Sequence, residues 1–307
     1  MKRRTLLAVL ALALAAGPAP SVAQQKPAIG VSLPQDDNPF YIAMLRGIRA
    51  RAAELGFDVI TVSSQEDKAK QINGVQDLIA RGVKGILISP IDAVGVNAAY
   101  DAAAAAKVPI ISVARASTSP NQLLHVAMDE RQIGRDIGAY IAKAIGGKGK
   151  VAIIAGPPGS PTFKNLSDGI KESFAKHSAV QVVFDQFGAL TRERGLKLAE
   201  DALVANPDLA AIYAANDDVA LGASQAVVAA GRKGKVLVTG MNGIPPALRA
   251  VQDGSLAMTV ELNPVDWGRL GVDVLAGYLK GEKYKQQVFI KHVLIDSKNI
   301  GDKMPKK

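Results

Sequence analysis

Polar side chains able to recognise hydroxyl groups follow predicted strands in both halves of the chain: Asn38, Arg115, Asn216 and Asn242. Amides and guanidinium groups hydrogen-bond in fixed planes. Phe40 and Tyr41 add rings that suit apolar C–H faces. These residue types predict reversible binding of a small polar solute. Other interpretations stay open, because Asn38 and Asn216 also suit helix caps, Arg115 a solvated charge and Asn242 a turn.

Catalytic chemistry has weaker support. His125, His177 and His292 lie far apart in the sequence, and it contains no HExxH motif, GxSxG motif or cysteine pair. A hydrolase would need carboxylates or a nucleophile close together, and the candidates are Asp217, Asp218 and Glu261, for which capping or solvation is the alternative. We therefore predict a protein that is not an enzyme and that needs no metal or cofactor.

A strand, a turn and a helix are predicted to position Asn38. The run 28–33 is short, apolar and rich in β-branched residues, which indicates a buried strand. Pro39 suits the first position of a helix that Asn38 caps. Ile42, Leu45 and Ile48 recur at helical spacing and predict the buried face of that helix.

The same alternation continues along the chain and predicts an α/β fold. Apolar runs are typical of strands at 58–63, 85–89, 109–113, 125–128, 150–155, 180–185, 211–214, 235–240, 256–261 and 288–294, with helices between them. Buried strands that alternate with helices require parallel sheets covered on both faces. Two similar halves are implied. We expect the chain to cross between them more than once, because the first half otherwise lacks a covering helix.

The N-terminus predicts export. Basic residues at 2–4 precede an apolar run at 6–16, and small residues at 21–23 suit cleavage, so residues 1–23 are interpreted as a signal peptide. The 307-residue chain has no cysteine, which excludes disulfides and lipid attachment through a cysteine. Its net charge of +9 is spread without a clustered basic face. We expect a periplasmic protein that binds no nucleic acid and is not inserted in the membrane.

Several motifs together resemble the sugar-binding proteins of bacterial ABC importers, in particular the ribose-binding-protein-like family of type I periplasmic binding proteins. They are Asn38-Pro39-Phe40-Tyr41, residues 77–83 leading to Ser89-Pro90-Ile91-Asp92, Val108-Pro109-Ile110, residues 216–222 and Lys280-Gly281-Glu282. The resemblance implies two Rossmann-like lobes with parallel sheets, joined by a hinge of three strands. It assigns residues 24–129 and 263–285 to the N-terminal lobe and residues 130–262 and 286–307 to the C-terminal lobe.

The resemblance also implies which residues bind the ligand. Family pocket positions with hydrogen-bonding or ring character match Asn38, Phe40, Tyr41, Arg115, Asn216 and Asn242. At other positions the family residue is changed. The second pocket arginine aligns with Leu166, a stacking aromatic with Leu190, and a late glutamine with Leu262, or with Glu261 after a one-residue slip. Because buried hydrogen-bonding groups discriminate strongly between ligands, these changes favour a deoxy sugar, a short polyol or another less hydroxylated solute over ribose.

The expected function is capture of a small monosaccharide, deoxy sugar or polyol by hinge closure, followed by delivery to an ABC transporter permease. The alternative is a periplasmic subunit that presents its ligand to a sensor kinase or chemoreceptor. This alternative stays open, because such a subunit would have the same fold and cleft.

Overall fold

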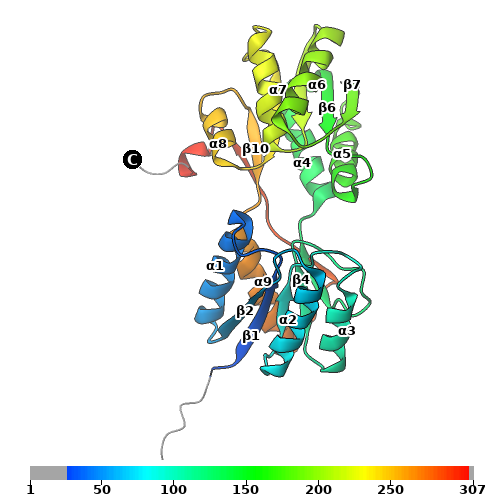
Figure 1. The fold of residues 1–307 in the computed structure, drawn as a ribbon. Helices are drawn as coiled ribbons and strands as arrows, with labels where there is room; N and C mark the ends of the chain where they lie inside the picture. The colour runs from blue at the N-terminus through cyan, green and yellow to red at the C-terminus, as the bar shows by residue number, and fades with distance from the viewer. Residues whose placement is uncertain (1–25, 304–307) are drawn as a thin grey trace, which may run out of the picture.

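The computed structural model describes residues 26–303, and these residues form two lobes, each built on a six-stranded sheet (Figure 1). The predicted signal peptide lies outside the described residues. The first sheet has the order β11-β5-β4-β3-β1-β2, and all its strands are parallel. Its strands are β1 (Ala28–Leu33), β2 (Asp58–Ser63), β3 (Ile86–Ile88), β4 (Ile110–Val113), β5 (Leu124–Ala127) and β11 (Gln287–Phe289).

The second sheet repeats this plan in the order β12-β10-β9-β8-β6-β7. Its strands are β6 (Lys148–Ala155), β7 (Ala179–Phe187), β8 (Leu209–Ala214), β9 (Leu237–Asn242), β10 (Met258–Glu261) and β12 (Val293–Asp296). Only the pairing of β12 with β10 is antiparallel among the described strands of this sheet. The predicted α/β class with two lobes is therefore confirmed.

Helices cover both faces of each sheet, as continuous apolar strands require. In the first lobe they are α1 (Pro39–Glu54), α2 (Lys68–Ala80), α3 (Asn97–Ala105) and α9 (Pro264–Leu279). In the second lobe they are α4 (Glu130–Ala144), α5 (Pro161–Phe174), α6 (Arg192–Ala205), α7 (Asp217–Ala229) and α8 (Pro245–Gln252), followed by a 3-10 turn, η1 (Ile300–Asp302). Among the described residues, no helix is both long and apolar enough to cross a membrane.

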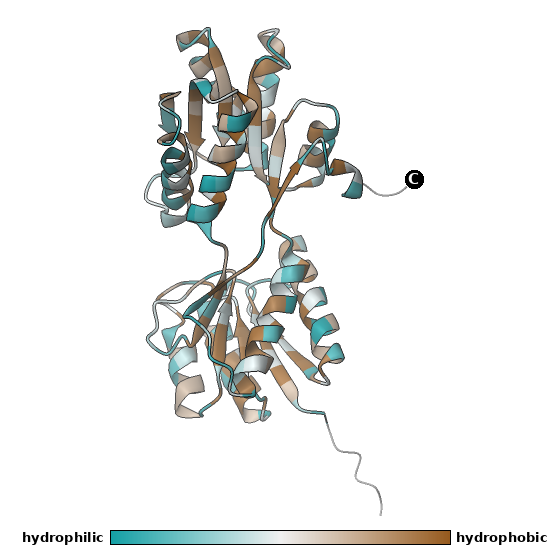
Figure 2. Ribbon diagram, turned by 180° about the vertical axis from the view of Figure 1, so that it is seen from behind, coloured by the Kyte–Doolittle hydropathy of each residue, from teal (hydrophilic) through white to brown (hydrophobic). Residues whose placement is uncertain are grey.

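The chain crosses between the lobes three times: between β5 and α4, between β10 and α9, and between β11 and β12. Seen from behind, these connections are thin and lie in the narrow waist of the molecule (Figure 2). The second crossing sends α9 back to cover the first lobe against α1, which is the covering helix that the first half of the sequence lacked.

The third crossing differs from the prediction for residues 288–294. The single strand predicted at 288–294 is two strands in two sheets, because β11 pairs with β5 while β12 pairs with β10. The predicted start of the C-terminal lobe at residue 286 is therefore wrong, since residues 287–289 belong to the first sheet.

Helix α1 begins at Pro39 as predicted, and the Asn38 side chain accepts a hydrogen bond from the backbone N–H of Phe40 at 2.9 Å. Its buried face matches the prediction at Ile48 but not at Ile42. Tyr41, Met44 and Ile48 point into the core, whereas Ile42 is 51% exposed. The apolar spacing of α1 alone allows either the face with Ile42 or the face with Tyr41 and Met44 to be buried. The contacts of α1 with the sheet and with helix α9 select the second of these faces.

Candidate functional site

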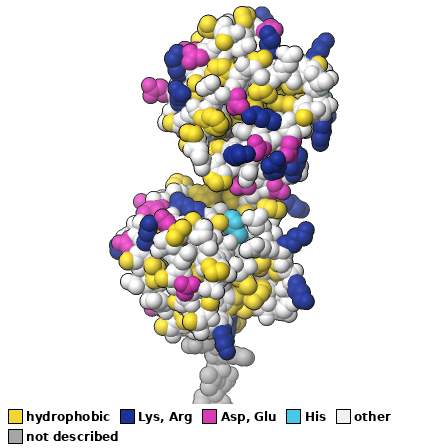
Figure 3. Space-filling model, turned by 90° about the vertical axis from the view of Figure 1, so that its right-hand side faces the viewer, with side chains coloured by type: hydrophobic (Ala, Val, Ile, Leu, Met, Phe, Trp, Pro, Cys, Tyr) yellow, Lys and Arg dark blue, Asp and Glu magenta, His cyan; other side chains and the backbone are white. Residues whose placement is uncertain are grey.

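A cavity of about 660 Å³ lies between the two lobes. Figure 3 shows the hollow at the waist, with hydrophobic side chains inside it and charged side chains around its edge. Both lobes contribute to its wall. The first lobe supplies Pro39, Phe40, Pro264 and Trp267, and the second lobe with the adjoining crossings supplies Met128, Thr162, Phe163, Leu190, Ala215, Asn216, Met241, Asn242, Gly243, Ile244, Pro245 and Leu262.

The wall of the first lobe is an aromatic cluster at the start of α1. The ring of Phe40 lies 5.3 Å from that of Tyr41 and 5.8 Å from that of Trp267, edge to face in both pairs. The indole N–H of Trp267 donates to the carbonyl of Val126 at 2.9 Å. Because that hydrogen bond holds the indole, Trp267 fixes Phe40 at the mouth of the cavity.

Arg115 joins this cluster from the carboxyl end of β4. Its guanidinium lies 5.8 Å from the centre of the Tyr41 ring and 3.6 Å from the carboxylate of Glu66. The preceding residue, Ala114, has a φ of 63°, in the region that favours glycine. The structure thus brings together Asn38, Phe40, Tyr41 and Arg115, but Asn38, Tyr41 and Arg115 do not line the interlobe cavity.

The wall of the second lobe contains the two predicted amides. Asn216 caps α7, and its Oδ1 accepts from the backbone N–H of Val219 at 2.9 Å. Asn242 ends β9 with a φ of 123°, in the positive-φ range that favours glycine. Both side chains line the cavity, at the carboxyl ends of neighbouring parallel strands.

Asp217 organises this wall from behind. It is 1% exposed, and its carboxylate accepts from the hydroxyl of Thr259 at 2.6 Å and from the backbone N–H of Ile244 at 2.8 Å. Burial raises the pKa of Asp217, while these hydrogen bonds act in the opposite direction. The carboxylate therefore joins α7, β10 and the loop after β9, and it holds Asn242 in place through that loop.

The residues that differ from the family pattern do not all line the cavity. Leu190 and Leu262 line the cavity. Leu166 does not, because it is fully buried in the core of the second lobe. Glu261 also lies outside the lining, and its carboxylate pairs with the ammonium group of Lys303 at 2.5 Å.

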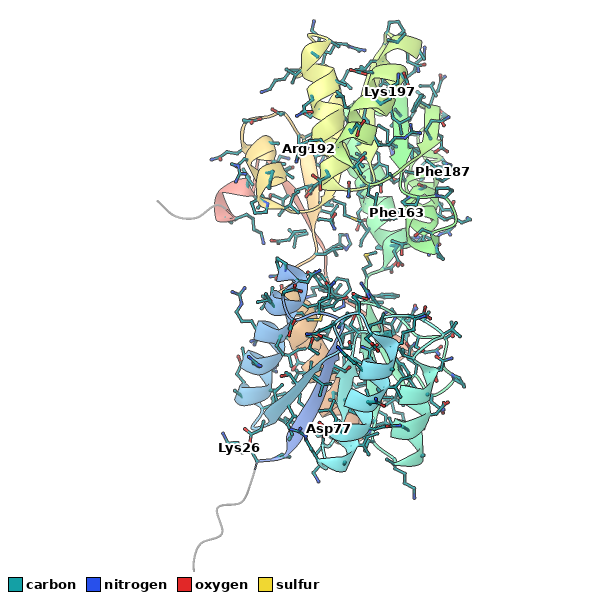
Figure 4. The ribbon with its side chains drawn as sticks, in the orientation of Figure 1. Lys26, Asp77, Phe163, Phe187, Arg192 and Lys197 are labelled. Atoms are coloured by element: carbon teal, nitrogen blue, oxygen red, sulfur yellow. The ribbon has the colours of Figure 1, made fainter. Side chains whose placement is uncertain are left out.

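Sequence reasoning missed part of the wall, including Met128, Thr162 and Phe163. Gly156 allows the ring of Phe163 to approach, since a Cβ at Gly156 would overlap that ring. Figure 4 shows Phe163 at the edge of the second lobe that faces the first. Met128 directly follows β5, and Phe163 lies in the first turn of α5, the helix that follows β6, so both come after the carboxyl ends of parallel strands, where ligands are expected. Trp267 is buried in the core and also reaches the cavity.

The carboxylates considered for hydrolysis are engaged elsewhere. Asp218 lies 3.0 Å from the guanidinium of Arg192, and Asp217 and Glu261 have the partners described above. Within residues 26–303, no group of three or more acidic, histidine or cysteine side chains is arranged to hold a metal ion. The arrangement of the wall suits hydrogen bonding and apolar contact.

Comparison with known proteins agrees with this geometry. Residues 29–283 match the periplasmic binding protein domain family. The chain is 36% identical to the ribose import binding protein of Salmonella typhimurium, over 92% of this chain and 94% of the relative. It is 32% identical to the D-allose-binding periplasmic protein of Escherichia coli, over 80% of this chain and 82% of the relative.

A solved structure described as the periplasmic ribose ABC transporter from Conexibacter woesei has the same fold, with a TM-score of 0.83 and 29% identity over 92% of this chain and 95% of that one. The matched share of the chain and the level of identity show that this protein belongs to the periplasmic binding protein family, with the two-lobed fold of its type I members.

Proposed function

We propose that this protein is the solute-binding component of a sugar-type ABC importer, and that it captures a small monosaccharide, deoxy sugar or polyol by closing its lobes. One observation carries the proposal. The cavity has walls from both lobes, with Phe40 on one side and Asn216 and Asn242 on the other, and three short connections join those lobes. A ligand that contacts both walls favours the closed arrangement by the free energy of those additional contacts.

The relatives support the ligand class. Proteins similar over most of their length are named for ribose import and for D-allose binding. These names favour the importer over a subunit that presents a ligand to a sensor kinase or chemoreceptor. The expected partner is the permease that receives the closed form. The proposed function involves a conformational change and no catalysis.

The periplasm is the proposed location. The N-terminal sequence has the order of a signal peptide, and the relatives include periplasmic proteins. The mature chain would begin near Gln24, two residues before the first described one.

Thermal unfolding of the mature protein in the presence of candidate solutes tests the function. The panel contains D-ribose, D-allose, deoxy sugars, short polyols and, as negative controls, amino acids. A ligand present at a hundredfold excess over its Kd should raise the free energy of unfolding by about 2.7 kcal/mol and raise Tm accordingly. Calorimetry then gives the Kd. A flat response to every sugar and polyol would contradict the proposal.

An amide variant tests whether the named wall is the binding wall. Asn216→Ser keeps an oxygen that can cap α7 but removes the amide N–H groups, so stability should change little while affinity falls about tenfold. Asp67→Ser is the matched control, because Asp67 caps α2 through Lys70 and does not line the cavity. Equal affinity in both variants would show that Asn216 does not contact the ligand.

A further inference from the structure

The wall of the interlobe cavity is uncharged. None of the described residues that line it is an aspartate, glutamate, lysine, arginine or histidine. Several charged residues next to lining residues in the chain have partners of their own: Lys164 pairs with Asp168 at 2.6 Å, Asp217 accepts from Thr259, and Glu261 pairs with Lys303. A charged solute enclosed here would lose its water without gaining an opposite charge, which is unfavourable.

Hydrogen-bonding capacity on the wall is limited. Thr162, Asn216 and Asn242 are the polar side chains with capacity among the described lining residues. Part of this hydrogen-bonding capacity is already used, because Asn216 Oδ1 accepts from the backbone N–H of Val219. The indole N–H of Trp267 is also occupied, since it donates to the carbonyl of Val126. A hydroxyl group that faces the second-lobe wall therefore finds few side-chain partners there.

The rest of the second-lobe wall is apolar. Met128, Phe163, Leu190, Ile244 and Leu262 face the same cavity from separate elements. A hydroxyl group enclosed against such side chains stays unpaired and weakens binding. A methyl group in the same place loses contact with water and strengthens binding.

We infer that the cavity selects an uncharged, partly deoxygenated sugar, in which a methyl group replaces a terminal hydroxymethyl group, and that Leu190 and Leu262 determine this preference. The inference rests on the proposed function and narrows its ligand class.

Matched ligand pairs test the inference. Calorimetry compares D-fucose with D-galactose, L-rhamnose with L-mannose, and 5-deoxy-D-ribose with D-ribose. In each pair that binds, the deoxy member should bind about tenfold more tightly. If the hydroxylated member binds equally well or better, the inference is wrong and the proposed function stands. If D-galacturonate or D-glucosamine binds more tightly than the neutral sugars, the uncharged class is wrong. If no sugar binds, the inference is wrong, and only a flat response to the polyols as well would contradict the proposed function.

Substitutions test whether Leu190 and Leu262 determine the preference for the deoxy sugar. Leu262→Gln adds an amide of similar size and should reduce the preference for the deoxy member to less than about threefold, since the lost hydroxyl partner is restored. Leu262→Met keeps the wall apolar and should retain the preference. Leu190→Gln makes the same test at a less buried position, should Leu262→Gln fail to fold. An unchanged preference in both glutamine variants would overturn the role of these leucines.

Discussion

Single side chains at the cavity serve the fold and the site together. Asn216 caps α7 through its Oδ1 and also lines the cavity. Asn38 is similar in type but more fully used, because its Oδ1 accepts from Phe40 and its Nδ2 donates to Gln35 at 2.9 Å. The cap interpretation is therefore correct for both residues, and at Asn216 it is compatible with the binding interpretation as well.

His125 is a structural histidine close to the first-lobe cluster. It is 8% exposed, and its Nε2 lies 3.2 Å from the carbonyl oxygen of Ala114, the strained residue before Arg115. Burial lowers the pKa of His125 below its usual value of 6.5, and the hydrogen bond to Ala114 only partly opposes this. The neutral ring donates to that carbonyl in the folded state.

The lowered pKa predicts a loss of stability in acid. Because the unfolded chain binds the proton at a higher pH than the folded chain, the free energy of unfolding should fall as the pH drops below 6.5. Urea unfolding at pH 7.5 and 5.0 measures this difference. His125→Gln can still donate to Ala114 but does not titrate, so its difference should be smaller than that of the wild type. Equal differences in the two proteins would refute the prediction.

At the scale of elements, the two helices that follow lobe crossings are anchored in the same way. Helix α9 packs on α1 through Gly268 and Gly47, and α4 packs on α5 through Gly134 and Gly169. A Cβ at any of these glycines would overlap a backbone carbonyl of the facing helix. Such close contact makes each crossing helix a rigid part of its lobe, and movement is left to the short connections.

Gly47→Ala should therefore destabilise the protein, despite the better helix propensity of alanine. The new methyl group would meet the carbonyl oxygen of Val265, and overpacking of this kind costs about 1 to 3 kcal/mol. Urea unfolding of the mature protein measures the loss. Gly301→Ala is the matched control, since a Cβ there meets nothing within 4 Å. Equal stability of the two variants would show that α1 and α9 can separate at no cost.

The whole molecule consists of two lobes with a cavity between them. Each lobe has its own sheet, and the apolar cluster on the α1–α9 side of one lobe continues into the α4–α5 side of the other. The pairs of helices that anchor the crossings share this cluster. Closure of the cavity should consequently occur as a rotation at the three crossings, with little change inside either lobe.

Distances between labels test this motion. The chain has no cysteine, so cysteines introduced at the exposed positions Arg49 on α1 and Gln225 on α7 are unique labelling sites. A stabilising sugar should shorten the distance between these labels, measured by energy transfer. Labels at Lys148 and Gln225, both in the second lobe, should keep their distance. A constant distance in the first pair at saturating sugar would rule out closure.

The sequence alone determined the elements and the class of fold. Strand β1, the start of α1 at Pro39 and the cap at Asn216 depend on local patterns of apolar residues, prolines and cap oxygens, so they could be predicted from neighbouring residues. The rule that ligands meet the carboxyl ends of parallel strands also pointed to Phe40, Asn216 and Asn242.

Only the tertiary structure decided which candidates share a wall. Both leucines, Leu166 and Leu190, were aligned with pocket positions. The packing of α5 buries Leu166 in the core, whereas Leu190 lies in the loop between β7 and α6 and lines the cavity. The split between β11 and β12 likewise depends on β5 and β10, partners distant in the sequence. Apolar spacing shows that a face is buried, but the surface that buries it belongs to other elements.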